Sequence, residues 1–218
     1  MIVAVAGGKG GVGKSTVAFN LGAALDAVVV DADLGMADLP TGPGPDLHDV
    51  LAGRADPVEA VRESPLRLLP CGRSLAGARA ADVGELADAL AAVEEAYGTV
   101  VVDCPAGRRA DVGVPLAVAD ALVLVTAPRA FALADALRTR ELARELDAGL
   151  AVVVLNRVVE APPTDAVRRL FGAPTVAVPA DPRVGRSIPD VAPVVTAAPA
   201  SDATRRFEEL ADRVRSCR

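Results

Sequence analysis

A short run near the start of the chain combines glycines, lysines and hydroxyl residues in a phosphate-binding order. Residues 7–16 read Gly-Gly-Lys-Gly-Gly-Val-Gly-Lys-Ser-Thr. Gly8, Gly13, Lys14 and Ser15 fit the P-loop spacing, in which glycines let backbone N–H groups face phosphate oxygens. In that pattern the lysine supplies a charge for the β- and γ-phosphates, and the hydroxyl reaches Mg²⁺. A glycine-rich turn without a ligand is the alternative, and it leaves the lysine and hydroxyl unexplained.

The segments on either side of the run support this interpretation. An apolar, β-branched stretch at 2–6 predicts a buried strand, and 14–26 predicts a helix whose N-terminus faces the ligand. We expect the nucleotide to contact the following loop residues: Gly8, Gly10, Gly11, Val12, Gly13, Lys14, Ser15 and Thr16.

A second lysine inside the loop distinguishes it from an ordinary P-loop. Lys9 and Lys14 are the two lysines of the chain, so the remaining 21 of its 23 basic residues are arginine. A compact ammonium on a flexible stem fits a crowded phosphate site better than a planar guanidinium does. A solvated loop charge is the alternative for Lys9.

Carboxylates follow two further predicted strands. Asp31 and Asp33 come at and after the apolar run 28–31, and Asp103 follows the run 99–102. The carboxyl ends of strands form the ligand edge of an open α/β sheet, so these groups are candidates for metal binding and for orienting water. The alternatives are an acid pair that caps the next helix and an ordinary turn.

Asn156 and Arg157 follow the predicted strand 150–155. An amide at this edge can pair with both the donor and the acceptor of adenine, while a turn-forming asparagine is the other interpretation.

The loop resembles the deviant Walker A motif of the MinD/ParA class of P-loop ATPases. The second switch of that family is similar to Asp-Cys-Pro-Ala-Gly at 103–107. The corresponding segment of archaeal-type MinD proteins is similar to Leu-His-Asp-Val-Leu at 47–51. The resemblance implies that Lys9 reaches a partner subunit's nucleotide, that Asp33 positions the attacking water, and that Gly107 contacts the γ-phosphate. It also places Pro179 and Asp181 around the adenine, and Ser15 and Asp103 at the Mg²⁺.

Strand and helix patterns alternate along the chain, which predicts an α/β fold. We expect one domain, residues 1–218, with a mostly parallel sheet and helices on both faces, a Rossmann-like three-layer sandwich. Further strands are expected at 66–69, 121–126 and 175–178. Further helices are expected at 46–53, 56–63, 82–97, 130–146, 164–171 and 201–215.

The net charge and the numbers of cysteines and histidines limit the kinds of partner and metal site that we expect. The net charge is −6 and the isoelectric point about 4.9, which disfavours DNA binding without excluding it. Three separated cysteines disfavour a metal-cluster framework, and His48, the single histidine, is expected to be structural. We expect a cytoplasmic chain without a signal peptide, transmembrane segment or basic membrane-targeting helix, recruited to a membrane or pole by a partner.

The sequence therefore predicts an Mg²⁺-dependent ATPase that hydrolyses ATP to ADP and phosphate. The resemblance implies a homodimer in the ATP state, an unidentified protein partner or activator, and a role in positioning the division site or a polar structure. The alternatives are a ParA-like DNA-partitioning ATPase and a nucleotide-binding scaffold with little hydrolysis.

Overall fold

The computed structural model describes residues 1–8, 10–63, 65–106 and 110–217, with the backbone alone described at 110–112. Seven strands in this part of the chain form one parallel sheet in the order β3-β2-β4-β1-β5-β6-β7. The strands are β1 (Ile2–Ala6), β2 (Val28–Asp31), β3 (Leu68–Leu69), β4 (Val100–Asp103), β5 (Ala121–Thr126), β6 (Leu150–Val158) and β7 (Thr175–Pro179).

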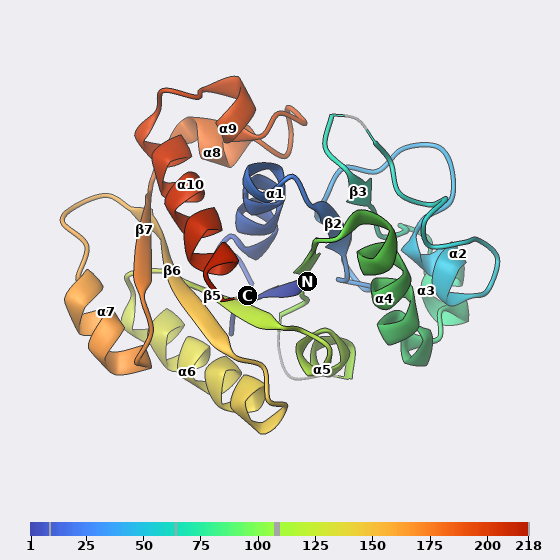
Figure 1. The fold of residues 1–218 in the computed structure, drawn as a ribbon, viewed down its shortest axis with the longest axis horizontal. Helices are drawn as coiled ribbons and strands as arrows, with labels where there is room; N and C mark the ends of the chain where they lie inside the picture. Colours follow the sequence, from blue (N-terminus) through green and yellow to red (C-terminus); the bar gives the residue numbers. More distant parts are fainter. Residues whose placement is uncertain (9, 64, 107–109, 218) are drawn as a thin grey trace.

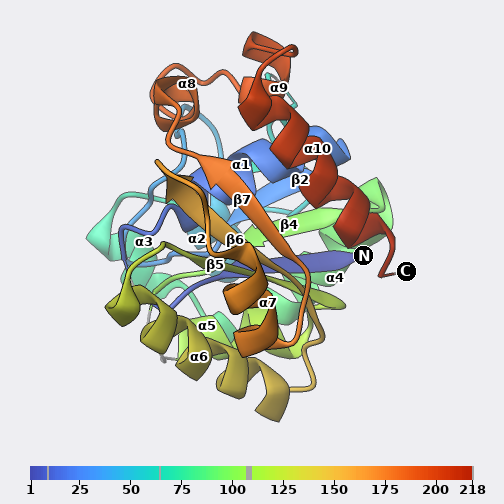
Figure 2. The ribbon, with the colours of Figure 1, turned by 90° about the vertical axis from the view of Figure 1, so that its left-hand side faces the viewer.

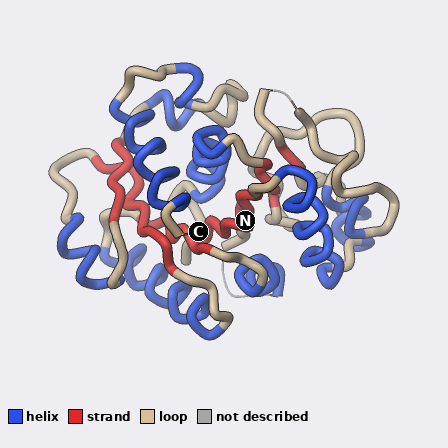
Figure 3. Tube along the Cα trace, in the orientation of Figure 1, coloured by secondary structure: helices blue, strands red, loops and turns tan. Residues whose placement is uncertain are grey.

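Helices cover both faces of this sheet (Figures 1 and 3). One face carries α1 (Lys14–Leu25), α8 (Pro182–Arg186), α9 (Val194–Ala197) and α10 (Asp202–Arg215). The other carries α2 (Leu47–Leu51), α3 (Leu75–Ala80), α4 (Leu86–Tyr97), α5 (Ala110–Ala117), α6 (Ala130–Glu145) and α7 (Thr164–Phe171). The predicted fold class is confirmed.

Side-chain alternation along β1 explains the two cores. Ile2, Ala4 and Ala6 join the apolar cluster under α4 and α6, whereas Val3 and Val5 join the cluster under α1 and α10. All five residues are at most 4% exposed, as expected for a central strand of a parallel sheet covered on both sides.

The connection between α1 and β2 is as short as the sequence indicates. Asp26 takes a left-handed conformation with φ 53°, and its backbone N–H closes the helix on the Ala23 carbonyl. Ala27 then donates to the Gly22 carbonyl, and β2 begins at Val28.

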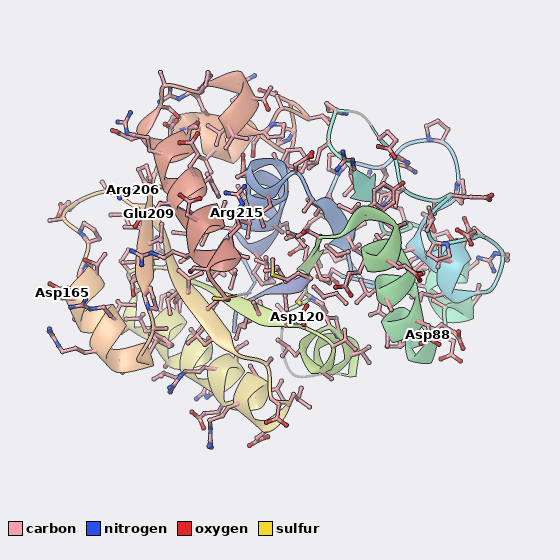
Figure 4. All side chains as sticks on the ribbon, in the orientation of Figure 1. Asp88, Asp120, Asp165, Arg206, Glu209 and Arg215 are labelled. Atoms are coloured by element: carbon pink, nitrogen blue, oxygen red, sulfur yellow. The ribbon has the colours of Figure 1, made fainter. Side chains whose placement is uncertain are left out.

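Polar contacts fix the edges of the layers. The Ile2 N–H donates to Asp120 Oδ2 at 2.8 Å, and Arg206 and Glu209 pair at 2.8 Å on the outer surface of α10 (Figure 4). Arg215 donates to the Ala24 carbonyl at 2.8 Å and joins the end of α10 to α1. Both termini lie at one edge of the sheet, opposite the carboxyl ends of the strands (Figure 2).

Several predicted elements need correction. The expected helix at 56–63 is a turn, because Asp56 Oδ1 accepts the N–H groups of Val58 and Glu59, and Arg62 then pairs with Leu68 in an isolated bridge. Four short or interrupted helices (α3, α5, α8 and α9) were not predicted, although Ser74 caps the start of α3 and Asp181 caps the start of α8. No helix in the described ranges is long and apolar enough to cross a bilayer.

Candidate functional site

The loop between β1 and α1 has the geometry of an anion site. Gly13 adopts φ 93°, a left-handed conformation, and Lys14 begins α1 immediately after it. Within the described residues no side chain caps this helix start, so its first N–H groups face the loop without a side-chain partner there. Positive backbone charge at a helix N-terminus favours phosphate, and the Lys14 side chain lies 7% exposed beside it.

Close packing explains why the loop begins with glycine. A Cβ on Gly8 would lie 2.2 Å from the carbonyl carbon and oxygen of Asp135 on α6. The loop and α6 therefore touch through their backbones. Lys9 lies outside the described residues, and its predicted role stays a prediction.

Asn156 braces the loop from the opposite side. Its Nδ2 donates to the Val12 carbonyl at 2.9 Å, and its Oδ1 accepts the Arg157 N–H at 2.9 Å. The side chain is 2% exposed and lies so close that a Cβ on Gly13 would be 2.3 Å from Nδ2. One N–H of the Asn156 amide is therefore bonded to the protein backbone, whereas the sequence analysis predicted that this amide pairs with adenine.

A bulge in β6 produces this placement. The strand continues to Val158 instead of ending at Leu155, and its register against β7 shifts between these two residues. Arg157 adopts φ 59° there. The irregularity turns Asn156 toward the loop, a local geometry that the apolar pattern of 150–155 does not encode.

The two strand-end carboxylates lie side by side. Asp31 of β2 and Asp103 of β4 are register partners, and both are at most 1% exposed. Among the residues that the structure describes, neither carboxylate oxygen of Asp103 has a partner within hydrogen-bonding geometry. Buried carboxylate oxygens without hydrogen-bond donors need a cation or a proton. The oxygen ligands offered here fit a hard divalent ion such as Mg²⁺.

Burial perturbs the acids of the site. It raises the pKa of Asp31 to about 7, against the opposing hydrogen bonds from the Leu39 and Asp33 N–H groups. It also raises the pKa of Asp103 well above the usual range, helped by Asp31 and opposed by the Ser15 hydroxyl and Lys14. Burial raises the pKa of Asp33 as well, with Lys14 again opposing. The free site therefore favours added positive charge.

The Asp33 side chain is held by its own turn. Asp33 Oδ1 accepts the Met36 N–H at 3.1 Å, and the Asp33 N–H donates to Asp31 Oδ1 at 3.2 Å. The carboxylate is half-buried and close enough to Lys14 for the two charges to interact.

Sequence reasoning missed two residues of this site. Asp38 Oδ2 accepts the Ser15 hydroxyl at 3.2 Å, which adds a third carboxylate beside the P-loop. Asn20 donates from Nδ2 to the Thr16 carbonyl and to Ser187, while its Oδ1 accepts the Val194 N–H. An asparagine among the apolar residues of the first helix was the available signal for Asn20.

Two adjoining hollows open along this edge. One, of about 280 Å³, is lined by P-loop residues, Asp38 and Gly185. The other, of about 450 Å³, includes Asn156, Pro179 and Asp181 in its lining. The hollows share Thr16, Arg157 and Gly185. Most of the predicted nucleotide-contacting residues are thus brought together, and Gly107 lies outside the described residues.

Comparisons with known proteins match this arrangement. A family model described as "CobQ/CobB/MinD/ParA nucleotide binding domain" matches residues 3–194. An uncharacterised ATP-binding protein of Methanocaldococcus jannaschii is 32% identical over 225 residues, covering 96% of this chain and 85% of that protein. The septum site-determining protein MinD of Synechocystis is 33% identical over 174 residues, covering 72% of this chain and 64% of that protein.

Solved structures show the same fold. The cell division ATPase MinD of Pyrococcus furiosus superposes with a TM-score of 0.92 at 28% identity, covering 100% of this chain and 99% of that one. MinD of Pyrococcus horikoshii, solved in complex with Mg-ADP, gives a TM-score of 0.90 at 27% identity, covering 98% and 95%.

Proposed function

Because this chain belongs to the CobQ/CobB/MinD/ParA nucleotide-binding family, we propose that it binds ATP with Mg²⁺ and hydrolyses it to ADP and phosphate. The observation that carries the proposal is the buried Asp103 carboxylate beside a P-loop lysine and hydroxyl; its two oxygens find no hydrogen-bond partner within the described parts of the chain. The Mg-ADP complex of the Pyrococcus horikoshii relative supports it.

The residues divide the work by position. Lys14 and the uncapped start of α1 bind the phosphates in the hollow of about 280 Å³. The hollow of about 450 Å³ beside Pro179 and Asp181 receives the base. Ser15 and Asp103 would hold Mg²⁺, which supplies charge neutralisation for the phosphate oxygens. Asp33 accepts a hydrogen bond from the attacking water and orients it; catalysis is mainly positioning and charge stabilisation.

We further propose that ATP gates a homodimer, in which Lys9 and Gly107 act at the γ-phosphate. Met36, in the turn after Asp33, is 69% exposed and places an apolar side chain beside the nucleotide edge. An apolar contact there supports closure of two copies face to face by a two-fold axis. In this scheme hydrolysis sets the lifetime of the dimer, and the septum-site relatives support a role in positioning division or polar structures through a partner or activator.

Calorimetry with ATP and ADP, each with Mg²⁺, tests nucleotide binding. Lys14→Ala should weaken ATP binding by about 2–3 kcal/mol, because a charged hydrogen bond to phosphate is lost. Arg138→Ala, an exposed cation on α6, is the matched control and should bind as the parent does. Equal ATP affinity in the parent and Lys14→Ala would overturn the P-loop assignment.

Light scattering and phosphate release test the switch. Asp33→Ala should bind ATP, stay dimeric and release little phosphate, whereas Lys9→Ala should bind ATP and stay monomeric. A Lys9→Ala protein that dimerises and hydrolyses normally would reduce Lys9 to a solvated charge. A parent protein that binds ATP without releasing phosphate would favour the scaffold alternative. Liposome sedimentation and DNA-shift assays, run with ATP, separate the membrane and DNA-partitioning alternatives.

A further inference from the structure

The single histidine of the chain lies in a closed slot behind the Asp33 turn. His48 is on α2, and its imidazole is 2% exposed. A Cβ added to Gly72 would lie 2.5 Å from His48 Nδ1, and one added to Gly77 would lie 2.9 Å from the same atom. These two glycines leave just enough room for the ring, so its orientation is set by packing.

The ring is connected to the turn that carries the water-orienting carboxylate. His48 Nε2 lies 3.1 Å from the Leu34 carbonyl oxygen, in a buried contact. Because a carbonyl oxygen can only accept a hydrogen bond, we assign the ring proton to Nε2, which donates the hydrogen bond to Leu34. Leu34 is the residue after Asp33, and the Met36 N–H two residues later donates back to Asp33 Oδ1. The histidine therefore holds a carbonyl inside the turn that fixes the Asp33 side chain.

Hydrogen bonds hold the start of α2, the helix that carries His48. Asp46 and Asp49 form a capping box at the start of α2, and the Leu47 N–H donates to the Pro70 carbonyl at 2.9 Å. Cys71 Sγ lies 3.4 Å from His48 Nε2 as a second, weaker partner. The helix, and with it the imidazole, is thus anchored to the segment that follows β3.

We propose that His48 is a positioning residue for hydrolysis, which sets the Asp33 carboxylate through the Leu34 carbonyl. This rests on the proposed ATPase function, in which Asp33 orients the water. We expect no contact between the histidine and the nucleotide, because none of the described residues that line the two hollows belongs to α2. Its loss should therefore lower the rate of hydrolysis and leave nucleotide affinity unchanged.

Three substitutions separate positioning from packing. His48→Gln keeps an amide N–H at the reach of Nε2, whereas the shorter side chain of His48→Asn places its amide near Nδ1, away from the Leu34 carbonyl. Cys71→Ala is the control, because it removes the other neighbour of Nε2 and leaves the Leu34 bond intact. We expect kcat to fall on the order of tenfold to a hundredfold in His48→Asn, since misplacing a reacting group by about 1 Å can reduce the rate by such factors. His48→Gln should recover most of the rate, and Cys71→Ala should match the parent.

Affinity for ATP with Mg²⁺, measured by calorimetry, should stay within about twofold across all four proteins, because the P-loop is untouched. Parental hydrolysis in His48→Asn, or a His48→Gln protein as slow as His48→Asn, would overturn the proposal. So would a loss of ATP affinity in His48→Asn, because that result indicates general disruption of the site.

Hydrogen exchange of the nucleotide-free proteins tests the connection without any activity. The Met36 amide should exchange several-fold faster in His48→Asn than in the parent, His48→Gln or Cys71→Ala, because its bonds to Asp33 Oδ1 and to the Asp33 carbonyl both loosen with the turn. Equal Met36 exchange in all four proteins would refute the connection. A parent that exchanges as expected but never hydrolyses ATP would refute the proposed function and leave the mechanical link standing.

Discussion

The buried Asp31 carboxylate should make the nucleotide-free protein less stable as the pH rises. Its pKa is raised from 3.8 to about 7, mainly by burial at the end of β2. Below about pH 3 the carboxyl is protonated in both the folded and the unfolded chain, and there is no penalty. Between pH 4 and 7 the unfolded chain releases this proton while the folded chain keeps it. Stability therefore falls through this window and levels off above pH 7.

The size of the effect follows from the two pKa values. Each tenfold change in the dissociation constant corresponds to about 1.4 kcal/mol, so the penalty is about 1.6 kcal/mol at pH 5 and about 4 kcal/mol at pH 8. Asp31→Asn removes the ionisation but also weakens hydrogen bonds from the Leu39 and Asp33 N–H groups. That second loss is nearly independent of pH, so comparing two pH values isolates the ionisation.

The assay is urea unfolding of the parent and Asp31→Asn at pH 5 and pH 8, without nucleotide and with EDTA. Relative to the parent, Asp31→Asn should gain about 2–3 kcal/mol between pH 5 and pH 8. Relief of the neighbouring Asp103 acts in the same direction. Asp88→Asn, which alters an exposed carboxylate on α4 (Figure 4), is the control and should follow the parent at both pH values. The same pH dependence in Asp31→Asn and the parent would show that Asp31 is ionised in the folded state, and would refute the reasoning.

Three further substitutions test the loop and its acids. Gly13→Ala should destabilise the protein by about 1–3 kcal/mol and abolish ATP binding, because φ 93° is strained for alanine and the added methyl group would clash with Asn156. Urea unfolding measures the stability and calorimetry the binding, and normal ATP binding would contradict this prediction. Asn156→Ala should lower the unfolding free energy by about 1–3 kcal/mol, because it leaves the buried Val12 carbonyl unpaired, and an unchanged urea midpoint would argue against the brace. Asp38→Asn should raise ADP affinity in EDTA and reduce the gain on adding Mg²⁺, because one anion beside Ser15 is removed; equal Mg²⁺ dependence by calorimetry would dismiss this role.

Local patterns were enough to predict the strand, loop and helix at residues 2–25 and the acids at the carboxyl ends of β2 and β4. Residue type and short-range spacing encode these features, because apolar β-branched runs become buried strands and their carboxyl ends meet at one edge. Asp31 and Asp103 therefore meet as expected, although nothing in either segment states that β2 and β4 are neighbours.

Features that depend on long-range packing were not predicted in detail. Asn156 is 144 residues from the Val12 carbonyl that it binds, and a bulge decides its direction. His48 was expected to be structural; it is buried, and its link to Leu34 is visible only once α2 packs behind the turn. The prediction of a helix at 56–63 was wrong, because the turn closed by the Asp56 side chain and the pairing of Arg62 with Leu68 of β3 outweigh the local helix preference.

The central place of β1 in the sheet has a consequence for how the chain is made. β1 pairs with β4 and β5, so Val3 meets Val101 and Val5 meets Val123. At about 5–20 residues per second, a ribosome needs roughly 6–24 seconds to supply those partners. During that interval an apolar strand and its attached loop have emerged without neighbours on either side. Synthesis of this chain thus includes a long period in which a fully buried central strand is open to chaperones or to aggregation.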